Sequence, residues 1–501
     1  MPPRSSMHFL AFDLGAESGR AILGGFDGEL LGLKVIHRFP NQPVTIGPTT
    51  YWDVLRLFHE MKHGLAQAVE LHGKGICSMA VDTWGVDFGL LGPSDELLGN
   101  PIHYRDPHTE GIMEEAFDMV PREELFAQTG NQFMRFNSLF QLLALAKHRS
   151  SILEISKTLL HMPNLLDFCF TGRKVTEFTI ASTTQMLDPW TRNWAFGLLE
   201  RFAIDTALLT EIVEPGTVIG PVLDSITHDL GIGGAHIPVI VPASHDTGSA
   251  VAAVPAEGED YVYISSGTWS LMGIDVREPM LNGKSLAYNF TNEGGVCGTY
   301  RFLKNIMGLW LVQQCRRSFE RDGNIYDYDQ LTALASKARP LRMLIDPDAE
   351  DFLNPPDMPT AIRDFCRKTN QLLPEDEGAF VRCCLESLAL KYRWTVDRLV
   401  EITGRHFQVI HMVGGGIQNK LLCQLTADAT GLPVIAGPVE ATAVGNILMQ
   451  AMALGEINSI DEGRQIVKTS FPVEMYEPGD RAPWDDVYEE FCELIGEGRA
   501  R

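Results

Sequence analysis

Phe12-Asp13-Leu14-Gly15-Ala16-Glu17-Ser18-Gly19-Arg20 is the stretch that decides the fold of the N-terminal half. Strand-like runs lie on both sides of it, over His8–Leu14 and Arg20–Phe26, so its glycines and polar residues predict a tight turn between two strands. Backbone N–H groups and a hydroxyl in such a turn could bind phosphate oxygens. Asp13 could hold Mg²⁺ through water, and Arg20 could offset phosphate charge. An ordinary hairpin turn, in which Asp and Gly are common anyway, is the alternative.

The segments after this turn continue the strand pattern and then alternate between helix and strand. Further strand-like runs cover Leu30–His37, Ile76–Val81 and Val86–Leu91, and a helical pattern runs from about Trp52 to Leu71. The predicted order at the start of the chain is therefore β-β-β-α-β, followed by more helix and strand.

The predicted helix over residues 52–71 has one apolar arc. At 3.6 residues per turn this arc contains Trp52, Leu55, Phe58, Met61, Leu65 and Val69. The run His59-Glu60-Met61-Lys62-His63 in the same helix matches the H-E-x-x-H zinc motif. Because His59 and His63 lie opposite the apolar arc, we interpret them as part of a solvated face and expect no zinc site.

The second half of the chain begins with a similar pattern. Strand-like runs at Tyr261–Ile264 and Trp269–Ile274 flank the polar turn Ser265-Ser266-Gly267-Thr268. A helical pattern covers Gly378–Gly404. Two facing turns of this kind could hold a triphosphate from both sides of a cleft. The recurrence suggests a duplication, although a single sequence gives only weak evidence for one.

A run of three glycines follows a strand in the second half. The strand Val409–Val413 leads into Gly414-Gly415-Gly416, and a helix follows. Glycines at this point allow a flat ligand to approach the backbone closely. Close packing of the strand against the helix is an equally good explanation. The spacing is not that of the dinucleotide fingerprint, so a nicotinamide cofactor is not indicated.

The joint between the halves, around Pro242–Glu257, is rich in small residues and proline. Within it, the small residues that follow Asp246 predict a helix whose N-terminus points at the cleft. Asp246 could then act as a general base on a hydroxyl, and the helix end would favour an incoming phosphate. The alternative is that Asp246 only caps this helix.

Size and composition limit the classes of function. The chain has 501 residues, of which 45% are apolar, so two domains with their own cores are expected. A formal net charge of −24 argues against a nucleic-acid or anionic-membrane partner. The nine cysteines are an odd number, which favours reduced thiols. Residues 1–6 contain no apolar stretch of the kind a secretion signal has, and no run of about 18 apolar residues occurs, so we expect a cytoplasmic protein.

Together these segments resemble the FGGY family of carbohydrate kinases, and the similarity spans nearly the whole chain. Within that family they are most similar to the members that act on L-rhamnulose. The combination is specific and does not arise by chance from turn chemistry. The segments that carry it are Ala11–Arg20, His37–Asn41, Val81–Leu91, Tyr104–Asp106, Thr129–Leu142, Ser244–Val251, Ser265–Gly273, Asn292–Gly295, Phe302–Gln314 and Gly414–Asp428.

The resemblance implies an α/β fold of two actin-like (ribonuclease H-like) domains flanking a deep cleft. Residues 1–250 would form the N-terminal FGGY domain, with the sugar site and the first phosphate loop. Residues 251–501 would form the C-terminal FGGY domain, which binds the nucleotide. The oligomeric state is left open, and a homo-oligomer is one option.

The same resemblance implies which residues bind the two substrates. Asp246 matches the catalytic base, and Asp13 matches the Mg²⁺-linked aspartate. Asp87, which lies near the sugar-pocket stretch, is the next candidate for the base if Asp246 is not. The positions that match ATP contacts are Ala16, Glu17, Ser18, Gly19, Arg20, Thr268, Gln313 and Gly415. The positions that match sugar contacts are Trp84, Gly85, His245, Thr247 and Asn305.

The function implied is the ATP- and Mg²⁺-dependent phosphorylation of a small sugar, first of all L-rhamnulose at its C1 hydroxyl. A kinase for another ketose or polyol, such as L-fuculose or D-xylulose, is the main alternative. An actin-like ATPase without a sugar substrate is a third. One departure bears on the choice of sugar: after Tyr104-Arg105-Asp106-Pro107 the family usually has Arg, and this chain has His108.

Overall fold

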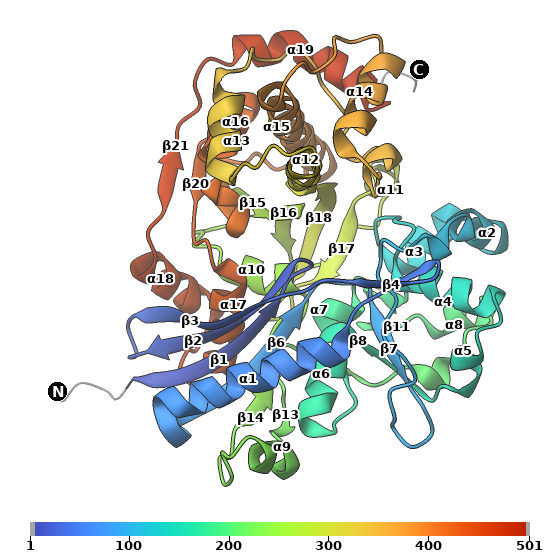
Figure 1. Ribbon diagram of the computed structural model, residues 1–501, viewed down its shortest axis with the longest axis vertical. Coiled ribbons are helices and arrows are strands. Elements are labelled where there is room, and N and C mark those ends of the chain that lie inside the picture. The colour runs from blue at the N-terminus through green and yellow to red at the C-terminus, as the bar shows by residue number, and fades with distance from the viewer. Residues whose placement is uncertain (1–5, 497–501) are drawn as a thin grey trace. The chain divides into compact units, whose positions relative to one another are not determined.

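The computed structural model describes residues 6–496, which divide into two compact units (Figure 1). The first unit takes the chain up to Pro255 together with Asp275–Phe302 and Ala441–Ser470. The second takes Ala256–Ile274, Leu303–Glu440 and the chain from Phe471 onward. Residues 1–5, on which the expectation of a missing secretion signal largely rests, lie outside the described residues.

The first unit is built on a sheet with the strand order β13-β14-β6-β1-β2-β3. β1, β2 and β3 are paired antiparallel, β6 is parallel to β1, and β14 is parallel to β6. The predicted strands at 8–14, 20–26, 30–37 and 76–81 are confirmed. The strand bounds are β1 (Met7–Leu14), β2 (Ser18–Phe26), β3 (Leu31–Pro40), β6 (Ile76–Thr83), β13 (Val218–Pro221) and β14 (Pro238–Ile240).

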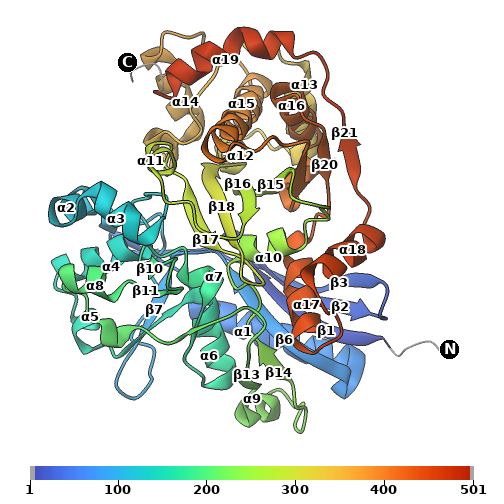
Figure 2. The same cartoon turned by 180° about the vertical axis from the view of Figure 1, so that it is seen from behind.

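Helices cover both faces of this sheet. Side chains that alternate along β2 point to opposite faces. A Cβ on Gly64 of helix α1 (Val54–His72) would lie 2.6 Å from the Cβ of Ala21, whereas a Cβ on Gly24 would meet Ile447 of α17 (Ala441–Ala453) at 2.5 Å. α1 is therefore packed on one face and α17 on the other, as Figures 1 and 2 show from opposite sides.

The predicted apolar arc of α1 was wrong in phase. Leu55 is 66% exposed, and Trp52 precedes the helix, whose N-cap is Asp53. Because the predicted arc starts from Trp52, which is not part of the helix, it is turned away from the helix face that packs on the sheet. His59 and His63 are exposed, as predicted. The face of the helix that is buried carries Val54, Leu57, Glu60, Met61, Gly64, Leu65 and Ala68.

Shorter elements complete the first unit and surround an apolar cluster centred on α4 and α7. β7 is paired antiparallel with β8, and β4 with β5. The bounds are β4 (Val44–Ile46), β5 (Thr49–Tyr51), β7 (Phe88–Leu91), α2 (Ile112–Met119), α3 (Arg122–Thr129), α4 (Ser138–Lys147), α5 (Ser151–Ile155), β8 (Thr158–His161), α6 (Met162–Thr171), β9 (Thr176–Glu177), α7 (Phe178–Ala181), β10 (Leu187–Asp188), β11 (Asn193–Trp194), α8 (Phe196–Arg201), β12 (Ile212–Val213), α9 (Asp224–Asp229), α10 (Asp246–Ala252), α11 (Gly283–Ala287), β17 (Thr291–Gly294) and α18 (Ile460–Ser470).

The second unit contains most of β18 and β16, together with β15, β19, β20 and β21, and these strands are neighbours in the order β18-β16-β15-β19-β20-β21 of one sheet. β15 and β16 are paired antiparallel, β19 is parallel to β15, β20 is parallel to β19, and β21 is antiparallel to β20. The bounds are β15 (Tyr261–Ser266), β16 (Trp269–Val276), β18 (Tyr300–Met307), β19 (Val409–Val413), β20 (Val434–Ala436) and β21 (Glu474–Tyr476).

The two units share one strand order. Five neighbouring strands of the unit 1 sheet, in the order β3-β2-β1-β6-β14, correspond to β18-β16-β15-β19-β20 in the sheet of unit 2. The turn that follows β1 therefore has the same place as the turn that follows β15, and the end of β6 has the same place as the end of β19. This equivalence supports the duplication that the sequence only suggested.

Helices make up most of the rest of the second unit. α15 (Glu377–Thr403) confirms the predicted helix at 378–404: its N-cap Asp376 accepts a hydrogen bond from the Ala379 N–H, and it ends at Gly404, whose φ of 68° is left-handed. All nine cysteines lie within the described residues and are free thiols. Among residues 6–496, no helix is long and apolar enough to cross a membrane. The other helices are α12 (Trp310–Arg321), α13 (Tyr328–Lys337), α14 (Met358–Lys368), α16 (Lys420–Thr430) and α19 (Ala482–Leu494).

The contact between α10 and α17 fixes the helix that begins with Asp246. A Cβ on Gly445 of α17 would lie 1.7 Å from the carbonyl oxygen of Ser249 in α10, so a side chain there would force the two helices apart. We expect Gly445→Ala to lower the free energy of unfolding by about 2 kcal/mol or more, because overpacking against backbone cannot relax by a rotamer change. Chemical denaturation would measure it.

Gly283→Ala is the matched control. A Cβ at Gly283, in the first turn of α11, meets no atom within 4 Å. The control should change stability by less than about 1 kcal/mol. Equal stabilities of the two variants would contradict close packing of α10 on α17.

Candidate active site

Two aspartates lie side by side where β1 and β6 end. The parallel register pairs Asp13 with Asp82, and both are buried. Asp13 forms an ion pair with Arg20, which follows on β2. Asp82 Oδ2 accepts a hydrogen bond of 2.6 Å from the amide of Asn446 in α17, whereas Oδ1 is buried without a partner among the described residues. Burial, and then the nearby charge of Asp13, raise the pKa of Asp82 well above its usual range.

The predicted phosphate turn joins β1 to β2 and is anchored by Asn41. The Gly15 N–H donates to the Ser18 carbonyl at 3.0 Å, and the Asn41 side chain donates to the Gly15 carbonyl at 2.9 Å. The Asn41 N–H in turn donates to the Glu17 carbonyl at 3.0 Å. Both ends of the turn are thereby held to the chain after β3. Sequence reasoning gave Asn41 no role, although it closes a segment that carries the family resemblance.

A third segment ends at the same edge of the sheet. The Thr83 N–H at the end of β6 donates to the Ser244 carbonyl at 2.9 Å, and Thr83 forms a parallel bridge with His245. The carboxyl ends of parallel strands meet at one edge. The sequence-predicted residues Asp13 and Asp246 are accordingly close enough for their charges to act on each other.

Asp246 is the first residue of α10 and not its cap. The N-cap position belongs to His245, whose side chain makes no capping hydrogen bond, so Asp246 is not the N-cap residue that the alternative assumed. Asp246 Oδ1 accepts hydrogen bonds from the Thr247 N–H at 2.6 Å and the Thr247 hydroxyl at 3.2 Å. Oδ2 accepts none from the described residues, and 29% of the side chain is exposed. Burial raises the pKa of Asp246, the nearby His245 lowers it, Asp13 raises it further, and the net shift is upward.

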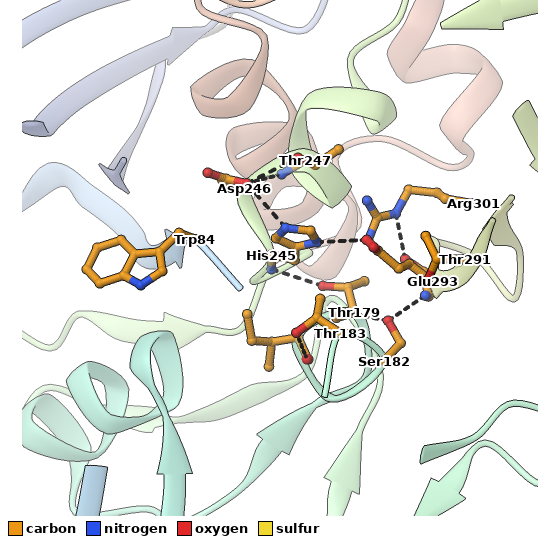
Figure 3. A network of polar contacts seen from close by, with 12 residues as sticks. Trp84, Thr179, Ser182, Thr183, His245, Asp246, Thr247, Thr291, Glu293 and Arg301 are labelled. Carbon is orange, nitrogen blue, oxygen red and sulfur yellow. Dashed lines mark hydrogen bonds and ion pairs between the residues drawn. The ribbon is translucent and has the colours of Figure 1, made fainter. Parts of the chain in front are cut away.

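His245 is held on several sides (Figure 3). Its Nε2 lies 3.5 Å from Asp246 Oδ1. Its Nδ1 lies 3.2 Å from Glu293 Oε2 and 3.2 Å from a guanidinium nitrogen of Arg301. Its backbone N–H donates to the Thr179 hydroxyl at 3.1 Å. The ring therefore joins the Asp246 carboxylate to a buried ion pair that sequence reasoning did not single out.

A buried carboxylate, Glu177, organises the backbone beneath His245. It accepts hydrogen bonds from the Thr179 N–H at 2.8 Å, the Thr179 hydroxyl at 2.6 Å and the Ser244 N–H at 3.1 Å. Full burial raises the pKa of Glu177 to about 7, although these donors act in the opposite direction. Glu177 thus ties the start of α7 to the segment that carries the candidate base.

Trp84 is fixed by the second candidate base. Asp87 Oδ2 accepts hydrogen bonds from the indole N–H of Trp84 at 2.9 Å and of Trp52 at 2.6 Å, and Oδ1 accepts one from Gln141 at 2.9 Å. The side chain is 1% exposed, with both oxygens engaged. Asp87 is therefore poorly placed to receive a proton from a substrate. Its role is to position Trp84, whose ring centroid lies 4.0 Å from that of Trp52.

Gly85 and His108 lie in tightly packed turns of the same unit. A Cβ on Gly85 would lie 3.2 Å from the side chain of Thr183, so the chain passes Thr183 closely. His108 Nδ1 is 3.0 Å from Asp106 Oδ1, and Asp106 Oδ2 accepts a hydrogen bond from the Thr50 N–H at 2.7 Å. Burial lowers the pKa of His108, which favours its neutral form. Here the imidazole stays paired to the loop that carries it.

The remaining predicted residues lie in the second unit. The Thr268 carbonyl accepts hydrogen bonds from the N–H groups of Gly308 and Trp310, both at 3.1 Å. The turn after β15 is thereby joined to the start of α12, which carries Gln313 in its first turn. The side-chain oxygen of Gln313 is buried and unpartnered among the described residues. Asn305 is buried in β18.

The three glycines after β19 have different roles. Gly414 has a φ of 88°, and a Cβ on Gly416 would lie 2.1 Å from the Ser266 hydroxyl, so both are needed for packing against the end of β15. A Cβ on Gly415 would meet no atom within 4 Å, which leaves its backbone accessible to a ligand. Close packing thus explains Gly414 and Gly416, and ligand approach at Gly415 stays a prediction.

No group of three or more His, Cys, Asp or Glu side chains within residues 6–496 could hold a metal ion by itself. The side-chain oxygens best suited to contribute to a metal site are those of the Asp13, Asp82 and Asp246 carboxylates. Magnesium prefers oxygen ligands and usually keeps several waters while it binds one or two carboxylates and substrate phosphates. The residues present fit an ion that arrives with a phosphate group.

Solved structures show the same two-domain fold. Xylulose kinase from Lactobacillus acidophilus superposes with a TM-score of 0.81 at 17% identity, and covers 99% of both chains. Plasmodium falciparum glycerol kinase with ADP gives a TM-score of 0.77 at 15% identity, again over 99% of both chains. The fold is that of a two-domain sugar kinase, with actin-like, ribonuclease H-like domains. The predicted fold class is confirmed.

Sequence comparisons identify the family. The models of the N- and C-terminal domains of the FGGY family of carbohydrate kinases match residues 8–253 and 262–454. A rhamnulokinase of Bacteroides thetaiotaomicron is 46% identical over 97% of this chain and 99% of its own length. A rhamnulokinase of Oceanobacillus iheyensis is 41% identical over 93% of this chain and 97% of its own length. The chain belongs to the FGGY family of carbohydrate kinases.

The titration of Asp87 gives a test of its burial. Its pKa is raised to about 7 in the folded protein, against about 3.9 in an unfolded chain. Between these values the folded protein binds more protons than the unfolded one, so the contribution of Asp87 to stability falls as the pH rises. Asp87→Asn does not titrate. The free energy of unfolding of the wild type, minus that of the variant, should therefore decrease from about pH 4 to about pH 7 and level off above that.

Denaturant titrations of both proteins at several pH values would measure this difference. A difference that stays constant across the range would show that Asp87 ionises normally in the folded protein.

Proposed function

We propose that this protein transfers the γ-phosphoryl group of ATP to a ketose, and that its substrate is L-rhamnulose, which becomes L-rhamnulose 1-phosphate in rhamnose metabolism. The proposal is supported by relatives named rhamnulokinase that match nearly the whole chain. The observation that carries the chemistry is the Asp246 carboxylate, which has one oxygen held by Thr247 and the other unengaged among the described residues, close to Asp13.

Asp246 is the proposed general base. It accepts the proton of the attacking C1 hydroxyl at Oδ2, while Thr247 holds Oδ1 and so fixes the direction of the carboxylate. The upward shift of the Asp246 pKa makes the group a stronger proton acceptor than an exposed aspartate. Phosphoryl transfer otherwise depends on positioning and on the neutralisation of charge.

The proposed ATP contacts come from both units, and the turns after β1 and β15, which supply Ala16–Arg20 and Thr268, have equivalent places in the two sheets. In unit 1 they are the turn residues Ala16, Glu17, Ser18, Gly19 and Arg20, which Asn41 holds in place. In unit 2 they are Thr268, Gln313 and Gly415. The unpartnered oxygen of Gln313 and the accessible backbone of Gly415 suit polar contacts to a nucleotide. Asp13 would hold Mg²⁺ through water, and the ion would neutralise phosphate charge when bound.

The proposed sugar contacts are Trp84, Gly85, His245, Thr247 and Asn305. Trp84 offers a rigid aromatic surface because Asp87 and Trp52 fix its indole. His245 and Thr247 flank the base and offer polar groups to sugar hydroxyls. We further propose the division of labour expected from the sequence, in a cytoplasmic enzyme with no nucleic-acid partner. Residues 1–250 provide the sugar site and the first phosphate loop, residues 251–501 bind the nucleotide, and Asn305 is the one proposed sugar contact from the C-terminal part.

A panel of ketoses in a coupled ADP-release assay tests the choice of substrate. We expect ADP release to require both the ketose and Mg²⁺, with L-rhamnulose preferred over L-fuculose and D-xylulose by kcat/KM. A tenfold preference for another sugar would overturn the substrate assignment and leave the kinase assignment standing. Equal ADP release without any sugar would favour an ATPase instead.

The substitution Asp246→Asn tests the base. Asn keeps the shape of the side chain and can still accept the Thr247 N–H at one oxygen, but it cannot take a proton. We expect kcat to fall by about 10²–10⁴. The KM for ATP should change little, because none of the proposed ATP contacts hydrogen-bonds to Asp246 in the described residues. The melting temperature serves as the control for folding, and a normally folded variant that keeps more than about a tenth of the wild-type kcat would exclude Asp246 as the base.

A further inference from the structure

The segment Asn292–Gly295 carries part of the family resemblance but supplies none of the proposed contacts to ATP or sugar. Glu293 is in β17, and Arg301 is in the part of β18 that belongs to the same unit. Their side chains are only 4% and 1% exposed, and the guanidinium lies 3.2 Å from the Glu293 carboxylate. Both reach Nδ1 of His245, the nitrogen that faces away from Asp246 (Figure 3).

The backbone around this ion pair is fixed to α7. Arg301 Nε donates to the Gly294 carbonyl at 2.8 Å, and the Gly294 N–H donates to the Ser182 hydroxyl at 2.6 Å. A Cβ on Gly294 would lie 2.7 Å from the ring of Phe178, so the strand approaches α7 as closely as a glycine allows. Thr179 of the same helix holds the backbone N–H of His245. The backbone of His245 and the strand that carries Glu293 are therefore both anchored to the segment around α7.

Stability alone does not explain two buried charges at this place. Ions taken out of water lose their hydration, and apolar residues of similar volume often serve a core equally well. This pair instead places a guanidinium, which can donate a hydrogen bond to Nδ1, and the carboxylate that neutralises it beside one nitrogen of an imidazole whose other nitrogen faces the candidate base. A histidine held through one ring nitrogen has its orientation and tautomer set for the group at the other nitrogen.

We propose that Glu293 and Arg301 are positioning residues for phosphoryl transfer, which hold the His245 ring so that its Nε2 remains at the Asp246 carboxylate. This inference rests on the proposed function, because the step that the two residues assist is the proposed phosphoryl transfer. Neither residue needs to touch the sugar or ATP for this role. Loss of the pair lets the ring turn, and the carboxylate then loses a neighbour that helps to keep Oδ2 directed at the substrate hydroxyl.

Glu293→Gln is the first test, because it removes the charge and keeps the size of the side chain. We expect kcat for the preferred ketose to fall about 10- to 100-fold, the usual effect of removing a partner that orients a functional histidine. The KM for ATP should stay within about twofold of wild type, because the proposed base and not the nucleotide site is disturbed.

Glu386→Gln is the matched control. Glu386 is also a buried, ion-paired glutamate, with 1% exposure and a 2.7 Å contact to Arg382, but it lies in α15 of the other unit and contacts no proposed site residue. The Glu386→Gln variant should be less stable than the wild type but have the same kcat.

If Glu293→Gln does not fold, the double variant Glu293→Gln/Arg301→Met removes both charges together, and we expect the same fall in kcat for it.

A readout that does not need turnover separates this inference from the proposed function. In protein with ¹⁵N-labelled histidine, the side-chain signals of His245 can be assigned through a His245→Gln variant. They should shift in Glu293→Gln and stay unchanged in Glu386→Gln, whether or not a ketose is phosphorylated. Unchanged His245 signals, or a folded Glu293→Gln variant with at least half of the wild-type kcat, would overturn the positioning role. If the wild-type protein phosphorylates no ketose, but the His245 signals still shift in Glu293→Gln, only the proposed function is overturned.

Discussion

The parallel alignment of β1, β6 and the segment after β14 is the constraint on which the candidate site depends. All three run in one direction, so Asp13, Thr83 and His245 come to the same edge of one sheet although long stretches of chain separate them. The strands are buried on both faces by α1 and α17, and a slip of one residue would turn every buried side chain to the opposite face. The register is therefore strongly fixed, and the contact of Asp13 with Asp82 is fixed with it.

This alignment places carboxylates where water is scarce, and the rest of the unit is arranged around them. A buried carboxylate is costly unless it accepts hydrogen bonds. Asp87 is satisfied by two indoles and an amide, and Glu177 by N–H groups and a hydroxyl, so each organises the chain around it. Asp82 and Asp246 each keep one oxygen that accepts no hydrogen bond from the described residues. The buried carboxylates thus divide into those that position neighbours and those left free to act.

Much of the fold could be predicted from the sequence, because strands, turns and the long helix α15 are encoded by neighbouring residues. The turns after β1 and β15 and the helix after His245 were predicted for this reason. The apolar arc of α1 was wrong because a buried tryptophan before the helix gives the same local pattern as one within it. Glu177, Glu293 and Arg301 escaped prediction because the segment that they hold, Ser244 and His245, is distant from them in the chain, and no spacing rule connects such residues. The roles of the predicted site residues remain predictions.

The shared strand order also explains how one architecture can supply two kinds of chemistry. In unit 1, the ends of β1 and β6 carry Asp13 and Asp82, so this edge concentrates charge. In unit 2, the equivalent strand ends carry Ser266 and three glycines, which pack so closely that a single Cβ on Gly416 would collide with Ser266. One edge therefore concentrates carboxylates, whereas the other consists largely of backbone without side chains. A duplicated sheet can diverge in this way because its strand ends, unlike its core, are free to change residue type without loss of the register.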